Sequence, residues 1–232
     1  MEGFTFVDIF ATKGIEYLLV IGYLMGFIGL LMLLRTPAKA VVRAKGGALS
    51  AMREWFHNPD GVYYHQGHSW LIPESSDVVK VGMDDFAQKL LGKIESIALT
   101  GVGASVKQGE KGWTLKVDSR SIDMLSPVSG EVIEINRELL SAPEQINQDP
   151  YGKAWLMKVR TPRLGPDLRG LLSGKLAKRW MEAVGEHLLA RMESKLGAVQ
   201  FDGGVPVGGM AKNVDPHHWD EMVKEFFLTT EP

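Results

Sequence analysis

The sequence predicts a mainly β fold with an N-terminal membrane helix and a C-terminal helical extension. Short apolar or alternating runs separated by turn residues fill the stretch 62–160, a pattern typical of an all-β unit of about 100 residues. An uncharged run precedes this unit, and apolar residues at three- and four-residue steps follow it. These observations divide the chain into 1–35, 36–61, 62–160 and 161–232.

The composition is globular, with 45% hydrophobic and 23% charged residues. The net charge of −2 does not indicate a nucleic-acid-binding protein. The chain has no cysteine, which excludes disulfides, thiolate metal sites, cysteine-ligated iron–sulfur clusters and a cysteine nucleophile. No sequence pattern joins a nucleophile to a base, so we predict a non-enzymatic chain without a cofactor.

The first predicted element is a membrane helix at about 15–34. Tyr17 to Leu34 is an uncharged run of 18 residues, which as a helix spans roughly 27 Å, close to the ~30 Å hydrocarbon core of a bilayer. A buried core helix is the alternative, but soluble helices seldom stay apolar on every face. A cleaved signal peptide is disfavoured, because the preceding segment is acidic and the apolar run is too long.

Charge around the predicted span gives its orientation. Only Lys13 precedes the span, whereas five basic residues follow it: Arg35, Lys39, Arg43, Lys45 and Arg53. The positive-inside rule then predicts a single-pass protein of the bacterial inner membrane, with its N-terminus outside and its C-terminal part in the cytoplasm. The lipid bilayer is accordingly a predicted partner.

Three glycines lie on one face of the predicted span. Gly22, Gly26 and Gly29 follow the i, i+4, i+7 spacing, and the first two form a GxxxG pair. In lipid, small residues allow two helix backbones to approach closely. We therefore predict that this face packs against an integral membrane subunit, although glycine is also common in membrane spans generally.

The linker and the β unit contain further expected elements. A juxtamembrane helix is expected over 36–56, interrupted at Gly46-Gly47, and the cluster Asn58-Pro59-Asp60-Gly61 indicates a turn. Within the β unit, Asp84 to Leu91 is expected to form a helix, since its acidic start suits the helix dipole.

The C-terminal extension is expected to contain two helices and a loop. Helical periodicity runs from Leu168 to about Lys195 through Leu172, Leu176, Trp180, Val184, His187, Leu188 and Met192. A glycine-rich loop follows at 202–209, and we interpret it as tight packing against a partner rather than as a nucleotide site. A short helix is expected around 218–227, with Asp215 as its cap and Pro216 at its first position.

Several short motifs in the β unit come in a distinctive order. They are His68-Ser69-Trp70, then Val81-Gly82-Met83-Asp84-Asp85-Phe86-Ala87-Gln88 with Leu91-Gly92, then Ser126-Pro127-Val128-Ser129-Gly130-Glu131-Val132, then Ala142-Pro143-Glu144 with Asn147, and finally Asp149-Pro150-Tyr151-Gly152 with Trp155-Leu156. In sequence and spacing these motifs resemble the glycine cleavage system H protein, a lipoyl-carrier family, over about 63–159. The resemblance implies a barrel-sandwich hybrid: two antiparallel sheets with a carrier hairpin at one end.

The hairpin departs from the family pattern at the position that matters most. The resemblance implies a lipoate-bearing lysine, and an ungapped count back from Ser126 places that position at Ser119. A serine hydroxyl would give at best a labile ester, and Arg120 stays protonated. The nearest amine is Lys116, three residues upstream and expected inside a strand, so we predict a degenerate, unlipoylated hairpin.

Two histidine groups are candidate metal ligands. His65 and His68 would point to opposite faces of a strand, which disfavours a shared metal, and His68 is interpreted as structural. A denser cluster comprises Asp215, His217, His218, Asp220 and Glu221. Metal binding by this cluster stays an open alternative to a plain helix start, and the predicted metal set is none.

These features lead to a functional hypothesis with two rivals. The main prediction is a non-catalytic, single-span accessory subunit of a membrane-bound respiratory or electron-transfer complex, which holds cytoplasmic subunits through the β unit and the C-terminal extension. The first rival is a membrane-tethered lipoyl or acyl carrier in glycine cleavage or related one-carbon metabolism, loaded at Lys116. The second is an adaptor that recognises lipoate enzymes without being their substrate.

Overall fold

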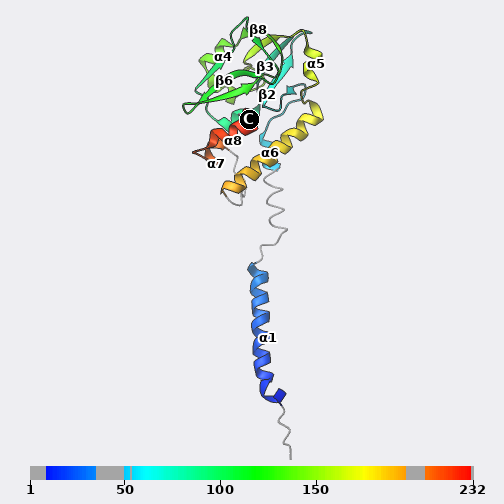
Figure 1. Cartoon of the computed structure of the whole chain (residues 1–232), viewed down its shortest axis with the longest axis vertical. Helices are drawn as coiled ribbons and strands as arrows, with labels where there is room; N and C mark the ends of the chain where they lie inside the picture. Colours follow the sequence, from blue (N-terminus) through cyan, green and yellow to red (C-terminus); the bar gives the residue numbers. More distant parts are fainter. Residues whose placement is uncertain (1–8, 35–49, 53, 197–206, 231–232) are drawn as a thin grey trace, which may run out of the picture. The chain divides into compact units, whose positions relative to one another are not determined.

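The computed structural model describes residues 9–34, 50–52, 54–196 and 207–230 (Figure 1). The chain divides into two compact units, 1–46 and 47–232, and each is described by itself. Among the described residues, the second unit holds the β strands and all the helices except α1.

The first unit contains helix α1 (Ile9–Leu34). In the described part of the chain, no helix combines the length and apolarity that a bilayer crossing requires. The predicted transmembrane helix at 15–34, the single-pass inner-membrane localisation and the N-outside orientation are therefore wrong.

The second unit contains a β-sandwich, as predicted for 62–160. One sheet is antiparallel throughout and has the order β1 (Tyr63–Tyr64), β2 (Ser69–Pro73), β3 (Val78–Met83), β9 (Met157–Arg160), β8 (Gly130–Ile135) and β5 (Ser105–Val106). The other has the order β4 (Ser96–Leu99), β6 (Lys111–Val117) and β7 (Arg120–Leu125).

The prediction of a mainly β chain is wrong, because α-helix takes 43% of the described residues. Much of this helix lies in α1 and in α6 (Gly174–Leu196), which flank the sandwich domain in sequence. The shorter helical elements are α3 (Asp85–Leu91), α4 (Arg137–Ser141), η1 (Pro143–Asn147), α5 (Leu164–Leu168), α7 (Met210–Val214) and α8 (Trp219–Phe226). Several of these formed where the sequence had indicated only loops between strands.

Helix α3 has clear local causes and matches the expected helix. Asp84 is its N-cap, and its carboxylate accepts the backbone N–H of Ala87 at 2.8 Å. Gly92 ends the helix with a φ of +78°, a conformation that glycine adopts without strain. The helix thereby presents Phe86 and Leu90 to the core.

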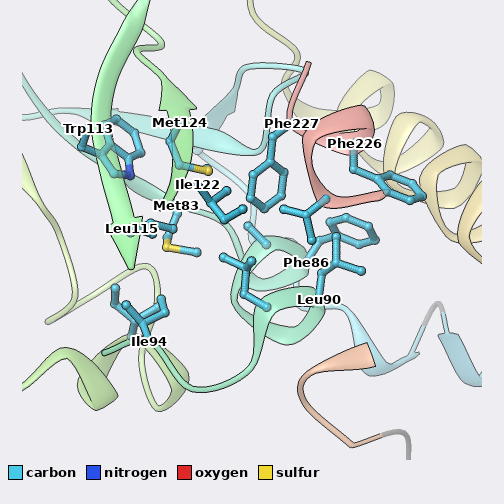
Figure 2. Packing of buried hydrophobic residues seen from close by; sticks show 14 of the residues in the cluster. Met83, Phe86, Leu90, Ile94, Trp113, Leu115, Ile122, Met124, Phe226 and Phe227 are labelled. Carbon is cyan, nitrogen blue, oxygen red and sulfur yellow. The ribbon is translucent and has the colours of Figure 1, made fainter. Parts of the chain in front are cut away.

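The main core joins both sheets, helix α3 and helix α8 (Figure 2). Trp113, Leu115, Ile122 and Met124 come from the smaller sheet and are all buried. On the other side they face residues of β3 and α3, and Phe227 closes the cluster from the C-terminal end of the chain. The sandwich core thus includes a residue far beyond the β unit.

Helix α6 packs with a slightly different face from the one predicted. Leu188 and Met192 are buried as expected, but Leu176 is 60% exposed. Ala177 and Met181 are buried instead, one position later in each turn. The buried face of the first half of α6 is therefore offset by one residue from the face that the spacing of the apolar residues predicted.

The linker 36–61 is described only in part. The segment 35–49, with the predicted Gly46-Gly47 interruption, lies outside the described residues. Met52 and Phe56 are buried in the main core. The predicted turn is present, with a φ of +81° at Gly61.

Candidate functional site

The candidate site is the hairpin formed by β6 and β7. Val117 pairs with Arg120, which leaves Asp118 and Ser119 as a two-residue turn. Both turn residues have positive φ, +46° and +63°, as a type I′ hairpin turn requires. The predicted hairpin and its tip are thus present, built on a turn type that matches the twist of the flanking strands.

The tip offers a hydroxyl and carries no amine. Ser119 is exposed at the turn, where the sequence count placed it. Lys116 lies inside β6, paired with Ser121, as expected. Its side chain is exposed whereas that of the next residue, Val117, is buried, so Lys116 projects from the outer face of the hairpin.

Charged residues of α7 and α8 hold both sides of this turn. Lys212 of α7 forms an ion pair with Asp118, the residue before Ser119. Asp220 of α8 forms an ion pair with Arg120, the residue after it. Each residue that flanks Ser119 is therefore matched by an opposite charge from the C-terminal segment.

Two further contacts strengthen this attachment. The Arg120 guanidinium donates a hydrogen bond to the backbone carbonyl of His217 at 2.9 Å. Trp219 is 3% exposed, and its ring lies 5.6 Å from the Arg120 guanidinium and 5.3 Å from the Lys212 ammonium. Both distances are within the range of cation–π attraction.

Helix α8 and the residue that follows it also pack into the sandwich through two aromatic rings. The Phe226 ring lies 5.3 Å from that of Phe86, and the Phe227 ring lies 5.9 Å from the His68 imidazole. Phe226 is 5% exposed and Phe227 is completely buried. The C-terminal segment therefore combines an apolar anchor with charges at the hairpin.

His68 has a structural position in this packing. Its ring is buried, and its Nδ1 lies 2.8 Å from the Asp84 carboxylate that caps α3. It also stacks on Phe86, at 4.3 Å between ring centroids. His65 does not share a strand with it, as had been assumed: the two lie at the ends of a tight turn, in which the His65 Nδ1 accepts the Gly67 N–H at 3.0 Å.

The acidic and histidine residues at 215–221 form ion pairs and a turn. No group of His and acidic residues with metal-binding spacing occurs in the ranges that the structure describes. Asp215 pairs with Lys195 at 2.8 Å, and the hydrogen bond from Lys195 holds the pKa of the Asp215 carboxyl well below its usual 3.8. Asp215 also accepts the His218 N–H at 3.0 Å.

The predicted start of the last helix needs correction. Helix α8 begins at Trp219 with His218 at the N-cap, so Asp215 is not its cap and Pro216 is not its first residue. Asp215 instead ends α7 and shapes the turn between the two helices. The bend places Lys212 and Asp220 on either side of the hairpin tip.

The described end of the glycine-rich loop packs within the chain. Residues 202–206 lie outside the described residues. Gly209 has a φ of +85° and donates its N–H to the Lys89 carbonyl at 2.8 Å. A Cβ on Gly92 would collide with the Gly209 backbone, so this end of the loop approaches the end of α3 closely. The packing of the loop against a partner stays an untested prediction.

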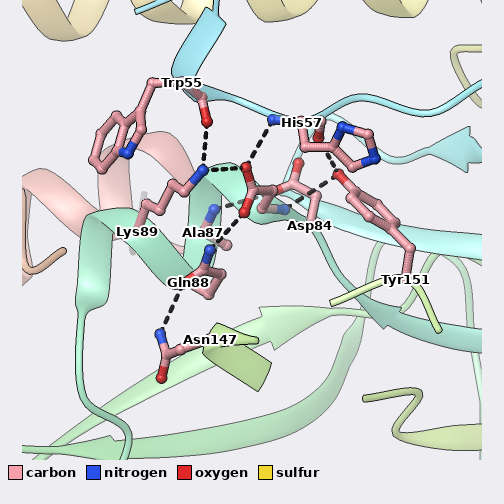
Figure 3. A network of polar contacts seen from close by, with 9 residues as sticks. Trp55, His57, Asp84, Ala87, Gln88, Lys89, Asn147 and Tyr151 are labelled. Carbon is pink, nitrogen blue, oxygen red and sulfur yellow. Dashed lines mark hydrogen bonds and ion pairs between the residues drawn. The ribbon is translucent and has the colours of Figure 1, made fainter. Parts of the chain in front are cut away.

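Sequence reasoning missed a polar network that links His57, Gln88 and Lys89 through the Asp85 carboxylate. Figure 3 shows this network, with Asp85 drawn but not labelled. The Asp85 carboxylate accepts the His57 N–H at 2.7 Å and pairs with the Lys89 ammonium at 2.6 Å. The Tyr151 hydroxyl donates to the His57 carbonyl at 2.9 Å, and burial raises the pKa of this phenol, which keeps the proton in place. The network ties the end of the linker to α3 and to the 149–152 motif.

The glycines at 22, 26 and 29 lie in α1. A Cβ built on Gly22, Gly26 or Gly29 would meet no atom within 4 Å. Their packing against another helix stays an untested prediction, and the membrane setting proposed for it is not retained.

Comparison with known proteins agrees with the geometry of the β unit. Residues 62–183 match the family described as "Glycine cleavage H-protein". The probable glycine cleavage system H protein of Pyrococcus abyssi is 38% identical over 125 residues, which cover 54% of this chain and 92% of that protein. The glycine cleavage system H protein of Rubrobacter xylanophilus is 42% identical over 110 residues, which cover 47% of this chain and 86% of that protein.

A solved structure is also similar. The crystal structure of a glycine cleavage system H protein from Mycobacterium marinum is 28% identical, with a TM-score of 0.48, and the similarity covers 55% of this chain and 99% of that one. The matched family region ends within α6, so α7 and α8 lie outside it. The family match covers more than half of the sequence, and the chain belongs to the glycine cleavage H-protein family.

Proposed function

We propose that this chain acts in glycine cleavage or a related one-carbon pathway, as an H-protein-family module that binds enzymes of the pathway without carrying lipoate at its hairpin tip. The family match over 62–183 supports the pathway. The observation that carries the rest is the exposed Ser119 at the tip of the β6–β7 hairpin, where the family resemblance implies a lysine.

The chemistry of the tip supports binding over carrying. Lipoate is attached to proteins through an amide, which requires a lysine amine, and a serine hydroxyl offers only an ester. Arg120 cannot substitute, because its guanidinium stays protonated and is paired with Asp220. The module would then work through its surface, by docking.

The proposed partners are proteins, and we propose no catalytic role for the chain itself. The β domain would present the family surface, and the C-terminal segment would add its own contacts. The respiratory membrane complex expected from the sequence depended on a membrane span and is not carried forward.

A second candidate function is a lipoyl or acyl carrier in the same pathway, loaded at Lys116. The observation that favours it is the exposure of the Lys116 side chain on the outer face of the hairpin. Against it stands the position of the lysine, which is within a strand and three residues before Ser119.

The proposal is tested by co-purification of the tagged full chain from cells that express the glycine cleavage enzymes. The account expects those enzymes to be retained, and to be retained equally by Ser119→Ala and Lys116→Arg variants, since neither residue would carry cargo. If none of these enzymes is retained, the proposed pathway is contradicted. Loss of retention in Lys116→Arg alone would favour the carrier function.

A further inference from the structure

The segment formed by α7 and α8 (residues 210–226), here termed the cap, lies against the hairpin tip and contacts the residues on either side of Ser119. It lies outside the matched family region. We propose that the cap is an autoinhibitory element, which must move before another protein can enclose the hairpin tip. Only the identity of the incoming enzyme rests on the proposed function.

The charge contacts are specific but reversible. Asp118 and Lys212 have side chains that are 58% and 25% exposed, and those of Arg120 and Asp220 are 41% and 17% exposed. Partly exposed ion pairs contribute little to stability and weaken with salt. They therefore fix where the cap sits without locking it there.

The apolar contacts explain why the cap is closed in the resting chain. Trp219 and Val223 of the cap are at most 3% exposed, and so is Phe227, the residue that follows the cap. Movement of the cap away from the sandwich would expose Phe86 of α3 and Ile122 of β7, which are both buried. A contiguous apolar patch beside a charged turn has the composition of a protein-binding surface.

The cap also binds the charged side chains through which another protein would recognise the turn. Asp118 and Arg120 are the charged residues next to Ser119, and both are paired with the cap. Arg120 is further held by the His217 carbonyl and by the Trp219 ring. An incoming protein that reads the turn must replace these contacts, so it competes directly with α7 and α8.

The test uses the tip itself as a reporter. A Ser119→Lys variant of the full chain supplies the missing amine and is incubated with lipoate, ATP and a lipoate–protein ligase, with intact mass as the readout. We expect slow modification while the cap is closed. Adding Lys212→Met and Asp220→Asn, which remove both ion pairs, should accelerate modification several-fold.

A matched control keeps the comparison fair. Lys111 pairs with Asp123 at 2.8 Å at the base of the same hairpin and does not bond to the cap. Ser119→Lys combined with Lys111→Met should therefore be modified as slowly as Ser119→Lys alone. Equal rates in all three variants would overturn the proposal.

A second measurement decides the matter if the ligase modifies none of these variants. Amide hydrogen exchange is compared between the full wild-type chain and Lys212→Met/Asp220→Asn, in peptides that cover 115–122 and 215–227. We expect faster exchange in both regions and no change in β2 and β3. Unchanged exchange in both regions would overturn the cap, and it would leave the pathway proposal untouched, because no partner enzyme takes part.

Discussion

Arg120, the first residue of β7, forms an ion pair with Asp220 of α8, which lies 100 residues later in the chain. This contact joins the tip of the family hairpin to a segment outside the matched family region. The same segment supplies Phe227 to the main core. The C-terminal extension is therefore part of the folded domain and contacts the tip of the β6–β7 hairpin.

Replacing Phe227 with Ala should lower the free energy of unfolding by about 3–5 kcal/mol, since the ring is completely buried against the sandwich. Urea denaturation of the full chain measures this loss. Leu228→Ala is the matched control, because Leu228 is adjacent and 51% exposed, and its substitution should stay within about 0.5 kcal/mol of wild type. Equal effects of the two substitutions would show that the end of α8 is not anchored as described.

Replacing Gly130 with Ala should destabilise the larger sheet by about 1–3 kcal/mol. An added Cβ there would collide with the backbone carbonyl oxygen of Arg160, which belongs to a paired strand and cannot move away cheaply. Gly101→Ala is the control, since a Cβ at Gly101 meets nothing within 4 Å. Thermal unfolding of both variants checks the prediction, and a tolerated Gly130→Ala would contradict the close approach of β8 and β9.

The pairing of Asp215 with Lys195 should make stability depend on acidic pH. The hydrogen bond from Lys195 lowers the pKa of Asp215 below 3.8, so its contribution is present above that value and is lost as pH falls toward the folded-state pKa. The urea midpoint of the wild type should therefore fall more steeply below about pH 4 than that of Asp215→Asn.

Lys195→Met is the companion variant, because it removes the largest cause of the shift and leaves the carboxyl in place. It should flatten the acid dependence as Asp215→Asn does. Parallel curves for wild type and both variants would mean that the ion pair does not contribute in solution.

The sequence contained enough information for the β unit and its hairpin. An ungapped count back from Ser126 placed the expected lipoate position at Ser119. The pairing of Val117 with Arg120 agrees, because it puts Ser119 in the turn of the hairpin. Turn residues and alternating apolar runs are local signals, so strands and hairpins can be predicted from them without knowledge of tertiary contacts. The helix expected over Asp84 to Leu91 is another local signal: α3 runs over Asp85–Leu91, and Asp84 is its N-cap.

The cap could not be predicted in the same way. The residues around 218–227 suggested a short helix, but nothing local specifies that Asp220 meets Arg120 or that Lys212 meets Asp118. Such pairs depend on how α7 and α8 turn, which the Asp215 contacts decide. The face of α6 was misjudged at Leu176 for the same reason, because packing partners were unknown.

The membrane prediction failed at a different step. It was drawn from the absence of charge over Tyr17 to Leu34, and it took that run as sufficient. The described part of α1 does not reach the combination of length and apolarity that a crossing needs. The predicted localisation and orientation followed from that single inference, so they are wrong with it. The predicted contact of this helix with another subunit is not tested.

The central claim is that this family member binds enzymes of the pathway without carrying lipoate at its hairpin tip. Intact-mass spectrometry tests the second part of this claim most directly. The wild-type full chain would be produced in cells supplied with lipoate and lipoylating enzymes, beside a Ser119→Lys, Lys212→Met, Asp220→Asn variant as the positive control. The account predicts an unmodified wild-type mass and a lipoyl-sized increment in the control. A lipoyl-sized increment on the wild type that disappears in Lys116→Arg would contradict it.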